Sequence, residues 1–113
     1  MTRDALAILA NIYIRFGRAE EAAAVFGAVA RLDADPSWAL RARCVALLRA
    51  GRHADAATEA KRLLEGRMDD TDRVPLLHVL AHASWALGRT QEARKAHREA
   101  SSLAAVSLSG ARS

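Results

Sequence analysis

The chain repeats one short phrase three times. Residues 17–22 read GRAEEA, residues 51–56 read GRHADA and residues 88–93 read GRTQEA. The first two glycines of these phrases are 34 residues apart and the last two are 37 apart. A period of this length is typical of tandem arrays of one supersecondary unit, in which each copy buries its apolar face against its neighbours. This recurrence constrains the fold more than any other feature of the sequence.

Small and apolar residues recur at fixed distances from each glycine. Alanine always follows five residues later, and the positions four before and nine after are also aligned: Ala22, Ala56, Ala93; Tyr13, Leu47, Ser84; Phe26, Ala60, His97. Small residues on both sides of a glycine, with large apolar residues at helical spacing, predict two closely packed helices. Glycine ends the first of them because it adopts left-handed dihedral angles without steric cost. The predicted helix pairs are 3–16 with 19–33, 37–50 with 53–65, and 74–87 with 90–104.

The connections between these pairs carry matching signals. Asp35 followed by Pro36 is a cap and first-turn signal for the second pair, and Pro75 is expected in the first turn of the third. The three extra residues of the longer period fall in the polar stretch EGRMDDTDR. The sequence therefore predicts one all-α domain over residues 1–104, with repeats at about 3–36, 37–70 and 74–104, and a disordered tail over 105–113. A plain bundle of three helix pairs is the alternative.

Composition indicates a soluble, cytoplasmic protein. Uncharged runs are shorter than the roughly 18 apolar residues that a membrane span needs, and the N-terminus lacks a small-residue cleavage site, so no membrane insertion is expected. The single cysteine, Cys44, excludes an internal disulfide and a zinc site built from several thiolates. Since Cys44 occupies a column of small packing residues, a buried structural thiol is predicted in preference to a nucleophile.

Charge is spread through the whole chain. Seventeen Lys and Arg residues are interleaved with thirteen acidic residues, for a formal net charge of +4. A nucleic-acid-binding protein more often gathers its basic residues into one stripe with aromatic residues between them. A solvated surface is therefore favoured and no nucleic-acid partner is expected. A basic nucleic-acid-binding or regulatory domain stays as the rival, and steep loss of binding with salt would support it.

No motif indicates catalysis. His78 and His82 lie four residues apart, as two metal ligands on one helix face do, but the glutamate of the metalloprotease signature is missing between them. A third ligand would have to come from another helix, so no metal site is predicted. No glycine-rich phosphate loop is present, and no residue that could act as a general base follows the serines near the C-terminus. We expect no enzyme activity and no cofactor.

The repeat pattern is similar to the tetratricopeptide repeat, whose 34-residue unit carries small and large apolar residues at such spacings. The first copy, LAILANIYIRFGRAEEAAAVF, fits best. Arg43, Ser84, Ala60 and His97 depart from it, because they occupy columns that are usually apolar and often large. The resemblance implies an all-α fold of three tandem helix pairs in a short right-handed superhelix.

From about residue 6 to 104 the chain also resembles the small Y-type (YscY-like) chaperones of bacterial type III secretion. The size and the segments LRARCVALL and EARKAHREA carry this resemblance. It implies a bacterial cytoplasmic chaperone involved in virulence, which forms a heterodimer with a small secreted X-type protein and contacts the export gate at the inner membrane. A generic tetratricopeptide adaptor for protein–protein interaction is the alternative.

The first helix of each pair is expected to line the concave face of such a stack. The residues of these helices outside the packing columns form the predicted partner-binding groove: Asn11, Ile14, Arg15, Trp38, Arg41, Val45, Leu48, Arg49, His78, His82 and Trp85. Several of them are large and apolar, and contiguous exposed apolar patches usually mark partner sites. The alternative is that some of these side chains pack between repeats.

Overall fold

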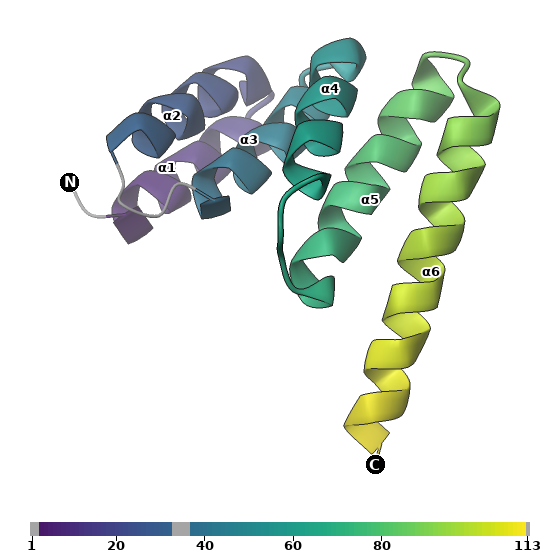
Figure 1. The fold of residues 1–113 in the computed structure, drawn as a ribbon. Helices are drawn as coiled ribbons and strands as arrows, with labels where there is room; N and C mark the ends of the chain where they lie inside the picture. The colour runs from purple at the N-terminus through teal and green to yellow at the C-terminus, as the bar shows by residue number, and fades with distance from the viewer. Residues whose placement is uncertain (1–2, 33–36, 113) are drawn as a thin grey trace.

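The structure is a computed structural model that describes residues 3–32 and 37–112. Its six helices are α1 (Arg3–Arg15), α2 (Ala19–Leu32), α3 (Ser37–Arg49), α4 (His53–Leu64), α5 (Asp70–Ala86) and α6 (Thr90–Arg112) (Figure 1). Each helix packs against the next one along the chain, and α3 also packs against α5. The described residues contain no strand. The predicted all-α fold of tandem helix pairs is confirmed.

The repeated phrase forms the same turn in all three pairs. Its glycines have positive φ angles: 74° at Gly17, 79° at Gly51 and 77° at Gly88. In the second pair the amide of Gly51 donates to the carbonyl of Leu48 at 3.1 Å, and the amide of Arg52 donates to that of Leu47 at 2.9 Å. These two bonds form a Schellman motif, which satisfies carbonyls at the end of the helix. The carbonyl of Arg52 then accepts the amide of Ala56 at 2.9 Å, so the next helix begins at once.

The alanine five residues after each glycine lies inside the molecule. Ala22 and Ala56 are 0 % exposed and Ala93 is 5 % exposed. A methyl group lets the two helices of a pair approach closely, and larger residues such as Phe26 and Leu47 fill the remaining core around them. The packing columns read from the sequence are thus confirmed at these positions.

The departures from the repeat pattern are accommodated in three ways. Ala60 and Ser84 are fully buried, so small side chains fill those columns. Arg43 is half-buried and pairs with Glu59 of α4 at 2.9 Å. Gly27 of α2 leaves space for it, since a Cβ atom added there would lie 3.4 Å from the Arg43 Nε. His97 is exposed.

Helix α5 begins at Asp70, earlier than the expected residue 74. Asp69 is the N-cap residue, and Asp70 and Asp72 lie in the first turn. Acidic side chains there are stabilised by the positive end of the helix dipole, which explains the earlier start. Pro75 therefore lies beyond the first turn, and the prediction that placed it in that turn was wrong.

Helix α6 continues to Arg112, whereas the sequence predicted a helix end at 104 and a disordered tail over 105–113. Figure 1 shows α6 alongside α5 and projecting past it. Residues 103–106, LAAV, include strong helix formers and no helix-ending glycine, so the helix can continue through them. The expected cap at Asp35 and Pro36 lies outside the described residues.

Candidate functional site

All the predicted groove residues lie on the first helices of the pairs, α1, α3 and α5. The half-buried members are Ile14, Trp38, Arg41, Val45 and Leu48, and the exposed members are Asn11, Arg15, Arg49, His78, His82 and Trp85. The apolar members are thus mostly half-buried and the polar members mostly exposed. The structure does not gather the whole set into one cavity.

The tryptophans of the predicted groove have different surroundings. The ring of Trp38 meets the ring of Phe26 edge-on, with centroids 6.1 Å apart and an interplanar angle of 87°, which joins α3 to the preceding pair. Val45 and Leu48 pack against the main core cluster. Trp85, in contrast, is 65 % exposed. Trp38, Val45 and Leu48 are therefore covered in part by the packing of the helices, and Trp85 is the most exposed of these four apolar side chains.

The polar residues of the predicted groove also lie in different parts of the structure. Arg41 reaches Asp72 at the start of α5, at 3.9 Å, and so connects α3 to α5. Ile14 and Arg49 line a common cavity of about 510 Å³ with Glu20 and Glu21 of α2. The lining of this cavity therefore mixes apolar and charged side chains.

Trp85 lies at the edge of a second cavity, also of about 510 Å³. His82 and Trp85 of α5 line it together with Arg94, His97 and Arg98 of α6. The three residues from α6 were not predicted as site residues. One indication of them was visible in the sequence, since His97 occupies a repeat position that is apolar in the first two copies.

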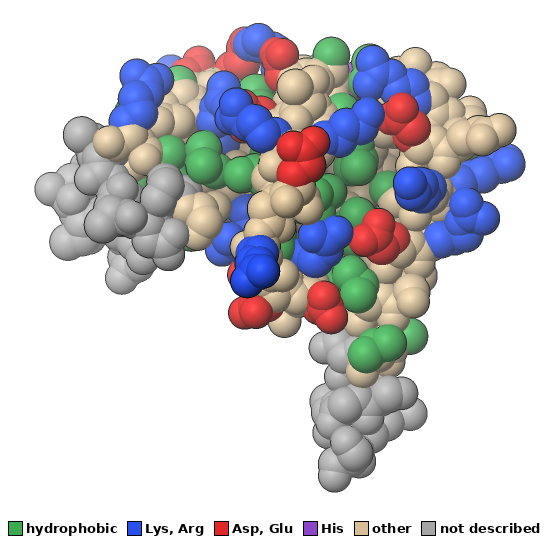
Figure 2. Space-filling model, in the orientation of Figure 1, with side chains coloured by type: hydrophobic (Ala, Val, Ile, Leu, Met, Phe, Trp, Pro, Cys, Tyr) green, Lys and Arg blue, Asp and Glu red, His purple; other side chains and the backbone are tan. Residues whose placement is uncertain are grey.

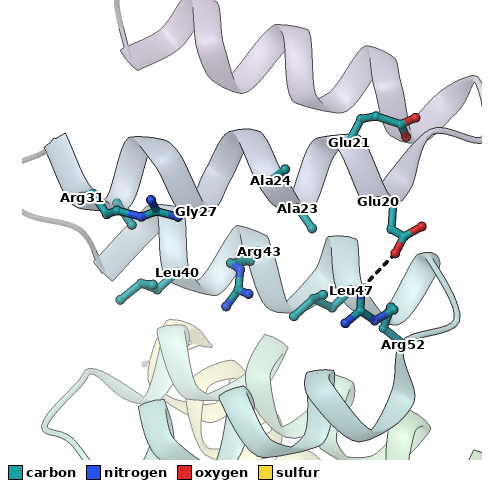
Figure 3. Close-up of a pocket in the computed structure, with 11 residues that line it drawn as sticks. Glu20, Glu21, Ala23, Ala24, Gly27, Arg31, Leu40, Arg43, Leu47 and Arg52 are labelled. Carbon is teal, nitrogen blue, oxygen red and sulfur yellow. Dashed lines mark hydrogen bonds and ion pairs between the residues drawn. The ribbon is translucent and has the colours of Figure 1, made fainter.

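A hollow of about 810 Å³ lies between α2 and α3 and contains none of the predicted groove residues (Figure 3). Leu40, Leu47 and Arg43 line it from α3. At one end the Arg52 Nη1 donates to Glu20 Oε1 at 2.9 Å. Hydrogen bonds to Glu20 and Asp55 raise the pKa of Arg52 above its usual value. This guanidinium therefore stays charged and links the first two pairs.

Cys44 is fully buried, as predicted. Burial, with a smaller contribution from the nearby Glu59 carboxylate, raises the pKa of its thiol to about 12. Since the thiolate is the reactive form, this cysteine is unsuited to nucleophilic chemistry at neutral pH. Within residues 3–32 and 37–112 no three His, Cys, Asp or Glu side chains are grouped so as to hold a metal ion.

Basic and acidic side chains alternate over the face of the molecule in Figure 2. Ion pairs connect neighbouring helices and turns of the described residues, including Arg43–Glu59, Arg52–Glu20, Lys61–Glu92 and Arg73–Glu99. These pairs are individually weak where exposed, but they neutralise the basic groups locally. Among the helices that the structure describes, none has the length and apolar character required to cross a membrane.

Two protein-family models match the chain. One model described as a tetratricopeptide repeat matches residues 4–36, and another with the same description matches residues 37–65 and 74–96. No curated protein and no solved structure matches the chain. The matched ranges follow the three helix pairs.

Proposed function

Because the chain belongs to the tetratricopeptide-repeat family, whose stacked helix pairs serve as protein-interaction modules, we propose that it is a cytoplasmic chaperone of bacterial type III secretion. In this proposal it holds a small X-type export substrate as a heterodimer and delivers it to the export gate at the inner membrane. It performs no catalysis. The resemblance over LRARCVALL and EARKAHREA supports this assignment within the family.

The observation that carries the proposal is the indole of Trp85, which is 65 % exposed at the cavity between α5 and α6. Val45 and Leu48 lie on α3, the first helix of the preceding pair, and are only half-buried. Large aromatic side chains at such positions commonly dominate a binding interface. A partly disordered export substrate would form helix as its apolar side chains dock against Trp85 and the half-buried side chains of α3, and its exposed apolar surface would be protected from aggregation.

Co-expression with the small reading frames that neighbour the gene tests the proposal. We expect one of them to co-purify as a heterodimer, and the Trp85→Ala variant to bind it about 30-fold more weakly, as expected for a loss of about 2 kcal/mol. The melting temperature of this variant should be unchanged, since Trp85 is exposed. Failure of every neighbouring product to co-purify would reject the chaperone assignment.

Trp38→Ala is the matched control for this experiment. Trp38 contacts Phe26 and is half-buried, so its removal should lower the free energy of unfolding by about 3 kcal/mol, near the low end for buried aromatic residues. Normal binding by a folded Trp85→Ala variant would show that Trp85 does not belong to the partner-binding groove. A complex that weakens steeply with salt would instead favour the nucleic-acid-binding rival.

A further inference from the structure

An apolar stripe on α1 lies at one end of the stack. Ile8, Ile12 and Phe16 are 62 %, 44 % and 79 % exposed. Ile8 and Ile12 lie one turn apart on the same face of α1. Phe16 directly follows the last residue of the helix, and its amide donates to the carbonyl of Ile12 at 3.1 Å, which continues the spacing. Large apolar side chains grouped in this way usually mark a contact surface. We call these three residues the α1 stripe.

The repeat register shows what this face does in the other pairs. Counted from the glycine of each copy, the equivalents of Ile8 and Ile12 are Ala42 and Ala46 in α3, and Val79 and Ala83 in α5. Ala46, Val79 and Ala83 are 0 %, 3 % and 0 % exposed, and Ala42 packs against their core cluster. The core cluster that holds Val79 and Ala83 also holds Ala57 and Ala60 of the preceding pair. This face is therefore the one by which a pair packs onto the pair before it.

The opposite end of the stack carries the complementary surface. We call the cavity lined by His82, Trp85, Arg94, His97 and Arg98 the C-terminal pocket. In the repeat register, the second-pair equivalents of Trp85, Arg94 and His97 are Leu48, Ala57 and Ala60, which contribute to the core shared with α5. The C-terminal pocket thus corresponds to the surface on which the first helix of a following pair packs.

An ion pair at the contact between the second and third pairs supports the same correspondence. The Lys61 Nζ lies 2.9 Å from the Glu92 Oε2, which joins α4 to α6. The register equivalent of Lys61 in the third pair is Arg98, and the equivalent of Glu92 in the first pair is Glu21. If the contact between pairs were repeated between two molecules, Arg98 of one would face Glu21 of the next. Both residues are exposed.

We propose that the protein associates head to tail with further copies of itself. The α1 stripe of one molecule packs into the C-terminal pocket of the next and continues the repeat stack across the molecular boundary. Because the two surfaces differ, the contact is heterologous, and each assembly keeps one free surface of each kind. The proposal goes beyond the chaperone function and does not depend on an export substrate, although both use Trp85.

Sedimentation velocity of the purified chain alone, over a series of concentrations, tests this proposal. The mean mass of the wild-type protein should rise with concentration. Ile12→Asp places a charge in the α1 stripe and Trp85→Glu places one in the C-terminal pocket, so each variant alone should stay monomeric. An equimolar mixture of the two should form a one-to-one dimer, because each retains the surface that the other lacks. Both residues are exposed, so circular dichroism should show unchanged melting.

Other results would overturn the proposal. A wild-type protein that stays monomeric at every concentration would exclude self-association. Loss of association in Ile12→Asp but not in Trp85→Glu, with no dimer formed between the two variants, would indicate a symmetric contact through α1. As a test of the register, Arg98→Glu should weaken association several-fold and the added Glu21→Arg should restore it, and lack of restoration would refute this alignment. Because no export substrate is present, a monomeric wild-type protein would leave the chaperone assignment standing, so the two proposals can fail separately.

Discussion

Replacing Gly51 by alanine should destabilise the protein through the backbone alone. Gly51 has φ of 79°, and a Cβ atom added there would meet no atom within 4 Å, so the substitution creates no clash. A left-handed conformation costs an L-residue about 1–2 kcal/mol, and the lower entropy of the unfolded chain offsets about 0.5 kcal/mol of this. We expect a net loss of about 1 kcal/mol in the free energy of unfolding, seen as a decrease of about 4 °C in the melting temperature.

Gly27→Ala is the matched control for this prediction. Gly27 lies inside α2, where alanine is favoured over glycine by about 0.5–1 kcal/mol. The added Cβ would approach the Arg43 Nε to 3.4 Å, and this flexible side chain can move by a few tenths of an ångström. Thermal melting followed by circular dichroism should therefore separate the two variants in opposite directions. A Gly51→Ala variant that melts like the wild type would refute the assignment of the repeated glycines as left-handed helix ends.

Two further predictions concern the core. Ala56→Leu should overpack the fully buried contact between α3 and α4 and lower the free energy of unfolding by about 1–3 kcal/mol; unchanged urea denaturation would contradict the repeat register. Cys44 should make stability fall at alkaline pH. Burial raises the pKa of this thiol to about 12 in the folded chain, so the unfolded chain loses the proton first, above about pH 8.5. The free energy of unfolding should fall by about 2 kcal/mol by about pH 10, and this fall should be absent in Cys44→Ala. An equal dependence of the unfolding free energy on pH in both proteins would argue against a protonated buried thiol.

Local features of the sequence determined the helix pairs and their turns. The glycine of the repeated phrase has a positive φ angle and ends the first helix of its pair, and the arginine after it begins the next, so the roles of Gly51 and Arg52 could be predicted without knowledge of the fold. The buried alanines followed from the same register, because Ala56 lies one helical turn into the second helix of its pair. These properties depend on neighbours along the chain, and neighbours along the chain are visible in the sequence.

The tertiary structure alone decided which side chains of the predicted groove are exposed. Trp38 and Trp85 both lie on first helices, yet Trp38 packs on Phe26 of the preceding pair and Trp85 is left 65 % exposed beside His97. In the same way, Arg94 and Arg98 of α6 line a cavity with His82 and Trp85 of α5, and neither arginine was predicted as a site residue. Burial of a side chain at the contact between pairs depends on whether another pair lies over it, and residues far apart in the sequence supply that cover.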